Sequence, residues 1–411
     1  MNKNKPAIRF KGFSDAWEQR QLGDIAVKVT EKNTQNTVSE TFTNSAEYGV
    51  ISQRDFFDHD VSNAEKIDGY YIIRNDDFVY NPRISTSAPC GPINRNKMGR
   101  NGVMSPLYTV FRTQNISHLF LEWYFKTSHW HPYMYFNGDS GARADRFSIK
   151  NDLFFQMPIP LPAEEEQCKI GAILERINNL ITLHQRKYEK LQNVKKSMLE
   201  KMFPKNGSKF PEIRFKGFTD AWEQRKVTEL GKIYIGLVTT MTKHYTKEGT
   251  LLIRNSDIKD GYFDFAESPI CLDEKFAQEN ESRMHKIGDV ITVHTGDVGT
   301  SAVITENEAN SIGFATIVTR PNLEIISSDY LCAFLNTDIH KKWAVSISTG
   351  DGRTNYNLGD YCELVIPFPS KEEQLKIASY IKKLNNLITL HQRESEKLQN
   401  IKKSMLEKMF V

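Results

Sequence analysis

Six segments of the chain combine cationic or imidazole side chains with amides, hydroxyls and glycine, a mixture suited to contacting nucleic acid. Arginine can form bidentate hydrogen bonds with guanine, asparagine can do so with adenine, and hydroxyls and backbone amides hold phosphates. The segments are residues 80–87, 94–100 and 140–146 in the first half of the chain, and 253–257, 294–300 and 348–356 in the second. Each one alone is more typical of an ordinary solvated loop, but their recurrence in both halves favours a binding role.

Other short motifs do not meet the requirements of the chemistry that they superficially suggest. Residues 296–299 (GDVG) lack the length and the lysine of a phosphate-binding loop. Residues 81–84 (NPRI) lack the second proline and the aromatic residue of an adenine methyltransferase motif. His129 and His131 have no acidic or thiol ligand at helical spacing, so their aromatic-rich segment is predicted to be a surface turn. The sequence gives no positive indication of a catalytic or metal centre.

The composition is that of a multidomain globular protein. The 411 residues include 39% hydrophobic and 26% charged residues, which excludes wholesale disorder and predicts two or three domains. The formal net charge of +3 permits nucleic-acid binding without indicating it. Five scattered cysteines without a C-x-x-C pair favour reduced thiols in a cytoplasmic protein. We expect neither a transmembrane segment nor a secretory signal.

An internal duplication organises the chain. Residues 8–20 (IRFKGFSDAWEQR) recur at 213–225 with one substitution, at an offset of 205. The motifs NNLITLHQR and KKSMLEKMF also occur twice, at an offset of 207. Between these repeats, residues 21–157 and 226–364 share only a skeleton. The chain is therefore predicted to be two copies of one unit with a constant frame and a variable insert.

Each copy ends in a predicted long helix, the first over residues 164–202, whose apolar residues alternate in steps of three and four. This is the pattern of a coiled-coil seam. The seam residues of the first helix are Ile170, Leu174, Ile177, Ile181, His184, Tyr188, Leu191, Val194, Met198 and Met202. Those of the second are Ile377, Ile381, Leu384, Ile388, His391, Ser395, Leu398, Ile401, Met405 and Met409. Neither helix can bury its stripe alone, so each is predicted to pack antiparallel on the other.

His184 and His391 occupy equivalent seam positions and are predicted to meet. The simplest interpretation is a polar pair that sets the register of the helices, with a pH switch or metal role as the weaker alternative.

The expected fold is mixed α/β, with two globular domains separated by two long antiparallel coiled-coil helices in a pseudo-two-fold internal repeat. Both inserts contain short strand patterns, and one amphipathic helix is expected in each, near residues 119–127 and 329–336. The predicted segments are a first domain (1–163), a first helix (164–203), a linker (204–212), a second domain (213–370) and a second helix (371–411).

The constant frame closely resembles that of type I restriction–modification specificity subunits. The resemblance rests on residues 8–13 (IRFKGF), Trp17, residues 22–25 (LGDI), residues 159–162 (IPLP) and residues 166–170 (EQCKI). The second copy repeats these motifs in the same order, with Trp222 in place of Trp17. The resemblance covers essentially the whole chain.

The resemblance implies two target-recognition domains, each reading one half of a split, asymmetric site on double-stranded DNA. It implies no catalytic centre and no cofactor in this chain. S-adenosylmethionine, ATP and Mg²⁺ are expected on the partners, which are two adenine-N6 methyltransferase (modification) subunits and restriction/translocase subunits. The helices are expected to set the spacer and dock the modification subunits. The residues expected to contact DNA are Asn81, Arg83, Arg143, Arg146, Arg254, His294, Arg353 and Asn355, with structural Arg–Asp pairs as the alternative for Arg143 and Arg146.

Three other functions are compatible with the residues alone. The first is a homodimeric DNA-binding regulator without methyltransferase partners. The second is a methyltransferase or nuclease with an unrecognised site, and the third is a scaffold that holds protein partners.

Overall fold

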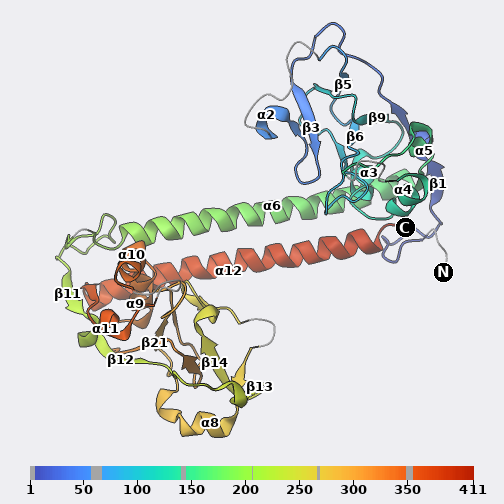
Figure 1. Ribbon diagram of the computed structural model, residues 1–411. Coiled ribbons are helices and arrows are strands. Elements are labelled where there is room, and N and C mark those ends of the chain that lie inside the picture. Colours follow the sequence, from blue (N-terminus) through green and yellow to red (C-terminus); the bar gives the residue numbers. More distant parts are fainter. Residues whose placement is uncertain (1–4, 57–66, 140–144, 206, 266–268, 349–354) are drawn as a thin grey trace. The chain divides into compact units, whose positions relative to one another are not determined.

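The computed structural model describes residues 5–56, 67–139, 145–205, 207–265, 269–348 and 355–411 (Figure 1). The chain divides into two compact units. Unit 1 comprises Met1–Leu183 with Glu394–Val411, and unit 2 comprises His184–Arg393. The predicted long helices are present as α6 (Glu164–Lys201) and α12 (Lys371–Lys408). Each helix contributes one part of its length to each unit. The segments predicted from the sequence instead treated each long helix as separate from the two globular domains.

Unit 1 contains two four-stranded sheets. The antiparallel first sheet has the order β2 (Ala26–Lys28), β9 (Thr109–Thr113), β6 (Phe78–Tyr80), β7 (Ile93–Arg95). The second has the order β4 (Gly49–Ser52), β3 (Thr41–Ser45), β8 (Gly102–Met104), β5 (Tyr71–Ile73), in which β3 and β8 are parallel. The short helices are α1 (Leu22–Ile25), α2 (Gln53–Phe56), α3 (His118–Tyr124), α4 (His131–Asn137) and α5 (Asn151–Phe155).

Unit 2 has the same two kinds of sheet. Its antiparallel sheet has the order β12 (Gly231–Ile235), β21 (Ile317–Pro321), β18 (Val290–Thr292), β19 (Ser301–Val303). The other has the order β13 (Tyr245–Thr246), β17 (Cys271–Leu272), β14 (Thr250–Arg254), β20 (Ile312–Phe314), with β14 and β20 parallel. A small hairpin consists of β15 (Ile258–Lys259) and β16 (Tyr262–Phe263). The helices are α7 (Val227–Leu230), α8 (Glu274–Glu279), α9 (Ser328–Leu335), α10 (Asp338–Ile347) and α11 (Leu358–Cys362), with 3₁₀ turns at Thr242–His244, Asn255–Asp257 and Glu281–Arg283.

The expectation of one helix per insert is wrong. The expected helices are present as α3 and α9, but α4 and α5 follow in unit 1, and α10 and α11 in unit 2. The segment at His129 and His131 is a surface turn only in part. His129 is exposed and lies in a turn, but Trp130 is buried and α4 begins at His131, with Pro132 in its first turn. The backbone N–H groups of a helix's first turn have no partner within the helix, so a proline at this position, which lacks an N–H, loses no hydrogen bond.

A buried ion pair ties the beginning of each copy to its long helix. The Arg9 guanidinium donates to both carboxylate oxygens of Glu166, at 2.7 and 2.8 Å. In unit 2, Arg214 binds Glu373 in the same way, at 2.8 and 2.9 Å. The side chains of Glu166 and Glu373 are 0% and 1% exposed, so both charges depend on their arginine partners.

The glutamine after each buried glutamate ties the long helix to the insert. The side chain of Gln167 accepts a hydrogen bond from the Ser117 amide at 3.0 Å and donates one to the Pro162 carbonyl at 2.9 Å. Gln374 makes the same two bonds with Ser327 and Pro369. Ser117 and Ser327 are the N-caps of α3 and α9, so the glutamine fixes where each of these helices starts.

The two long helices run antiparallel within each unit. In unit 2, the Nδ1 atoms of His184 and His391 lie 3.1 Å apart, and further along, Leu199 and Ile381 line one cavity. In unit 1, the Lys402 amine donates to Asn178 Oδ1 at 2.8 Å. All but one of the predicted seam residues are buried or half-buried.

That exception is Ile401, whose side chain is 40% exposed. At this point the neighbouring residue Lys402, not Ile401, turns toward α6. The apolar seam of the two helices thus contains one interruption, at Ile401.

The repeated phenylalanine after each long helix enters the core of a unit. Phe203 packs edge-to-face on Trp222 in unit 2, and Phe410 packs in the same manner on Trp17 in unit 1. Each pair consists of residues from the repeated motifs only, and each also packs on aromatic residues of the insert, Phe120 in unit 1 and Tyr330 in unit 2. Among the described helices, none has the length and apolarity required to cross a bilayer.

We predict that Glu166→Gln lowers the free energy of unfolding of unit 1 by about 3 kcal/mol, because it leaves the Arg9 charge without its buried partner. The control is Glu165→Gln, which removes an exposed pair with Lys169 and costs under about 0.5 kcal/mol. Urea unfolding of the full chain measures both values. Equal effects of the two substitutions would contradict a structural role for the Arg9–Glu166 pair.

Candidate nucleic-acid interface

Two of the predicted DNA-contacting segments of unit 1 lie side by side. Arg83, in the loop after β6, pairs with Arg146 in an antiparallel bridge. The flanking backbone bonds are from the Phe147 amide to the Pro82 carbonyl at 2.7 Å, and from the Ile84 amide to the Asp145 carbonyl at 3.0 Å. We call residues 81–84 with 145–147 the unit 1 loop pair. It brings together residues that are more than 60 positions apart in the sequence.

The two arginines of the unit 1 loop pair differ from Asn81 in their freedom to contact a ligand. Arg83 is exposed and Arg146 half-buried, and neither makes a side-chain ion pair with a described residue. The structural Arg–Asp pair considered for Arg146 is therefore not formed among the described residues. Asn81, in contrast, donates to the Asn44 carbonyl at 2.8 Å and accepts from the Arg83 amide at 3.0 Å. Its amide holds the loop that presents Arg83.

A buried amide network that no sequence pattern indicated supports this loop. Asn44 donates to the Val79 carbonyl at 2.7 Å and accepts from the Asn94 side chain at 2.6 Å. Asn94 accepts from the Lys126 amine at 2.5 Å. Asn94 belonged to a segment predicted to contact nucleic acid. Asn44 lies within strand β3, and no turn residues beside it indicated a functional loop.

Unit 2 has an equivalent loop pair. Thr295, after β18, pairs with Asn355 in an antiparallel bridge, and the Thr295 hydroxyl donates to Asn355 Oδ1 at 2.9 Å. The Tyr356 amide donates to the His294 carbonyl at 2.8 Å. The His294 amide donates to Asn255 Oδ1 at 2.8 Å, so Asn255 supports this loop. We call residues 293–295 with 355–356 the unit 2 loop pair.

His294 and Arg254 of unit 2 differ in charge and in their freedom to bind a ligand. Partial burial lowers the pKa of His294, so its ring is neutral at pH 7 and can both donate and accept hydrogen bonds. The Arg254 guanidinium donates to both oxygens of Asp257, at 3.0 and 2.7 Å, and this pairing raises its pKa. Arg254 is thus first a structural residue, because the ion pair occupies one edge of its guanidinium.

The two loop pairs occupy equivalent places in the duplicated fold. Each follows a central strand of the antiparallel sheet, and each strand is preceded by a buried aspartate bound to an arginine of the neighbouring strand. These pairs are Asp77 with Arg112, at 2.7 and 2.8 Å, and Asp289 with Arg320, also at 2.8 and 2.7 Å. The predicted residues Arg143 and Arg353 lie outside the described residues.

The described residues contain no group of three or more histidine, cysteine, aspartate or glutamate side chains placed to bind a metal ion. All five cysteines are free thiols. The loop pairs present one exposed arginine and half-buried arginine, amide, hydroxyl and imidazole groups on a hydrogen-bonded backbone, an arrangement suited to hydrogen bonding with a polar ligand surface.

Comparison with known proteins gives a consistent result. A sequence model of the type I restriction modification DNA specificity domain matches twice, at residues 14–193 and 219–400. The MjaVIII type I restriction enzyme specificity subunit of Methanocaldococcus jannaschii is 23% identical over 273 residues, which are 63% of this chain and 62% of the relative. The EcoBI specificity subunit of Escherichia coli is 29% identical over 138 residues, or 34% of this chain and 29% of the relative. The chain thus aligns with less than two thirds of the length of either relative.

Two solved structures have a similar fold. The S subunit of a type I restriction–modification system from M. genitalium has a TM-score of 0.55 at 13% identity, covering 99% of both chains. A chain from a study of complex assembly and conformational transition of the type I R-M system has a TM-score of 0.50 at 17% identity, covering 95% of this chain and 97% of that one.

We predict that acid destabilises the unit 2 loop pair through His340. Burial lowers the pKa of His340 to about 4, and its ring bonds the Leu335 carbonyl at 2.6 Å and the Tyr356 hydroxyl at 3.2 Å. Because the folded state holds the neutral ring, its contribution to stability is complete above about pH 6.5 and is lost as the pH falls toward 4.

The measurement is the free energy of unfolding of the full chain between pH 7.5 and 4.5. We expect His340→Gln to reduce its slope by up to about 1.4 kcal/mol per pH unit below pH 6.5. The control is the same substitution at an exposed histidine of unit 1, His118→Gln. An unaltered slope in His340→Gln would refute the prediction.

Proposed function

Because the chain belongs to the family of type I restriction modification DNA specificity domains, with a match to each of its two copies, we propose that it selects the DNA sequence for a type I restriction–modification complex. The observation that carries the proposal is the equivalent loop pair in each unit. In this function the chain has no catalytic centre of its own. It directs methylation, or cleavage when restriction subunits join, and works in the cytoplasm, where the DNA is.

Each loop pair reads one half of a split DNA site. In unit 1, Arg83 and Arg146 supply guanidinium donors, which suit the acceptor atoms of guanine. In unit 2, His294, Thr295 and Asn355 supply imidazole, hydroxyl and amide groups, a different set. The two half-sites therefore differ in sequence. Asn81 and Arg254 act on the same loops by holding the backbone, and Arg143 and Arg353 add to the readout.

The long helices dock two modification subunits, which carry S-adenosylmethionine and methylate adenine N6. The support is a second apolar stripe outside the seam. Leu180 and Leu183 are 37% and 45% exposed in unit 1, and Leu387 and Leu390 are 43% and 51% exposed in unit 2. These leucines come from the two copies of one motif, so each unit offers the same apolar surface to a partner. ATP and Mg²⁺ belong to the restriction subunits.

A genome-wide map of N6-methyladenine tests this function. We expect deletion of the gene to abolish methylation at one split, asymmetric motif. Replacing residues 226–364 by the insert of another family member should change one half of that motif only. A change in both halves would refute reading by separate domains. A map that deletion leaves unchanged, together with a stable free dimer, would instead support a DNA-binding regulator.

We also predict that the helices determine the spacer between the half-sites. Inserting four residues into both α6 and α12 lengthens each by about 6 Å. The methylated motif should then contain about two more unspecified base pairs, at roughly 3.4 Å each. Insertion of four residues into the linker at residues 204–212 serves as the control and should leave the spacer unchanged. An unaltered spacer in the helix variant would contradict the ruler role.

A further inference from the structure

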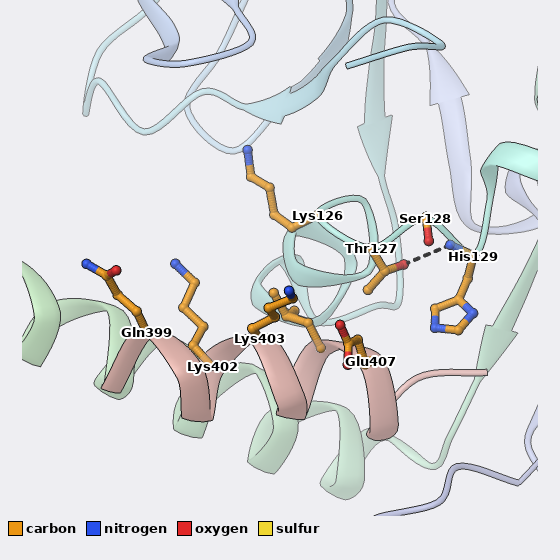
Figure 2. A pocket seen from close by; sticks show the side chains of 9 residues that line it. Lys126, Thr127, Ser128, His129, Gln399, Lys402, Lys403 and Glu407 are labelled. Atoms are coloured by element: carbon orange, nitrogen blue, oxygen red, sulfur yellow. Dashed lines mark hydrogen bonds between the residues drawn. The ribbon is translucent and has the colours of Figure 1, made fainter. Parts of the chain in front are cut away.

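Equivalent positions of the two long helices line a cavity in each unit. In unit 1 the cavity is about 500 Å³, and Lys402, Lys403 and Glu407 of α12 contribute to it (Figure 2). In unit 2 the cavity is about 330 Å³, and the identical motif of α6 contributes Lys195, Lys196 and Glu200. Because the helix residues are the same, any difference between the cavities comes from the inserts.

The insert of unit 2 neutralises its cavity. The Lys195 amine is buried, donates to the Asp260 carbonyl at 3.0 Å and lies 3.5 Å from a carboxylate oxygen of Asp260. Asp260 belongs to the turn between β15 and β16. Asp338 and Lys341 also line this cavity. The lining therefore contains three lysines (with Lys196) and three carboxylates (with Glu200).

The insert of unit 1 leaves the equivalent cavity cationic. Lys126, which follows α3, joins Lys402 and Lys403, while Glu407 is the only carboxylate among the described lining residues (Figure 2). Lys126 of unit 1 corresponds to Asn336 of unit 2. Two residues further along, unit 1 has Ser128 where unit 2 has Asp338. The lining thus contains three lysines and one carboxylate, an excess of two positive charges that the lining of the unit 2 cavity does not have, although the Lys126 amine itself donates to Asn94.

Lys402 makes no ion pair within 4 Å with a described carboxylate. Its amine donates to the Asn178 amide oxygen at 2.8 Å and lies 5.1 Å from the centre of the Trp123 ring. Burial lowers the pKa of this amine. The charge of Glu175 acts to raise this pKa, but Glu175 is itself paired with Lys97 at 3.3 Å. Lys195, the counterpart of Lys402, lies 3.5 Å from a carboxylate oxygen of Asp260, whereas no described residue places a carboxylate within ion-pair distance of Lys402. The unit 1 cavity therefore has room and charge for the carboxylate of a partner.

We propose that the unit 1 cavity receives an acidic loop of one modification subunit, whose carboxylate binds Lys402 as Asp260 binds Lys195 in unit 2. The inference rests on the proposed function, because it assigns the partner to a modification subunit. A protein loop is favoured over a DNA phosphate because the occupant of the equivalent surface in unit 2 is itself a peptide turn. The cavity also lies on a long helix and not on the loop pair. The two docking surfaces are consequently unequal: one depends on an intermolecular ion pair, and the other contains that pair already.

The test is titration of the full chain with purified modification subunit by calorimetry. For the variant Lys402→Glu/Lys403→Glu we expect one of the two binding sites to weaken at least about tenfold, because a like charge faces the carboxylate. The other site should keep its affinity. Lys402→Gln, which removes the charge without reversing it, should show a smaller loss at the same site. Higher salt should weaken that site selectively in the unaltered chain.

The matched control is Lys397→Glu, an exposed position of the same helix outside the cavity, which should leave both sites unchanged. Equal weakening of both sites, or no weakening in either lysine variant, would overturn the inference. Retained subunit binding with weakened binding to duplex DNA would also overturn it, because the cavity would then hold a phosphate. If the unaltered chain binds no modification subunit, the proposed function itself fails.

Discussion

The buried arginine–glutamate pair at the start of each long helix is the constraint on which the rest of each unit depends. Arg9 and Glu166 are 157 residues apart, and Arg214 and Glu373 are 159 apart. Each pair therefore closes the insert into a loop that leaves the frame and returns to it at one fixed point. The strand pairs β1 (Glu18–Gln21) with β10 (Pro158–Leu161), and β11 (Glu223–Lys226) with β22 (Val365–Phe368), reinforce this closure. The insert therefore leaves and rejoins the frame at the same place in both units, although the two inserts differ in sequence.

Within each insert, the backbone of the loop pair is constant and its side chains are variable. An aspartate–arginine pair holds each central strand, and a two-residue bridge holds the loop that follows. At equivalent places the bridge carries Arg83 and Arg146 in one unit and Thr295 and Asn355 in the other. The scaffold thus fixes where the functional groups lie, and the sequence at these positions alone determines which hydrogen bonds they can offer.

The sequence predicted those features that repetition or periodicity makes visible. The long helices and the helices near residues 119–127 and 329–336 required only local patterns and the duplication. The pairing of the two arginine-bearing segments of unit 1 was not predicted, because it is a contact between distant parts of the chain. Contacts that depend on the tertiary fold were not predictable. Arg254 belonged to a predicted segment, but its bond to Asp257 depends on the 3₁₀ turn that brings the two together. Nothing local marked Lys126, because its significance arises from a helix more than 270 residues away.

The two cavities show that identical helix residues do not have identical properties. Lys195 and Lys402 belong to copies of one nine-residue motif, yet one has a carboxylate of its own insert and the other has an amide and an aromatic ring. A lysine beside a carboxylate is neutralised, whereas a partly buried lysine without one attracts any anion that can reach it. An insert therefore determines more than the loop that it presents, because it also determines the charge of the adjoining helix surface. Exchange of an insert changes the electrostatics of the frame that receives it.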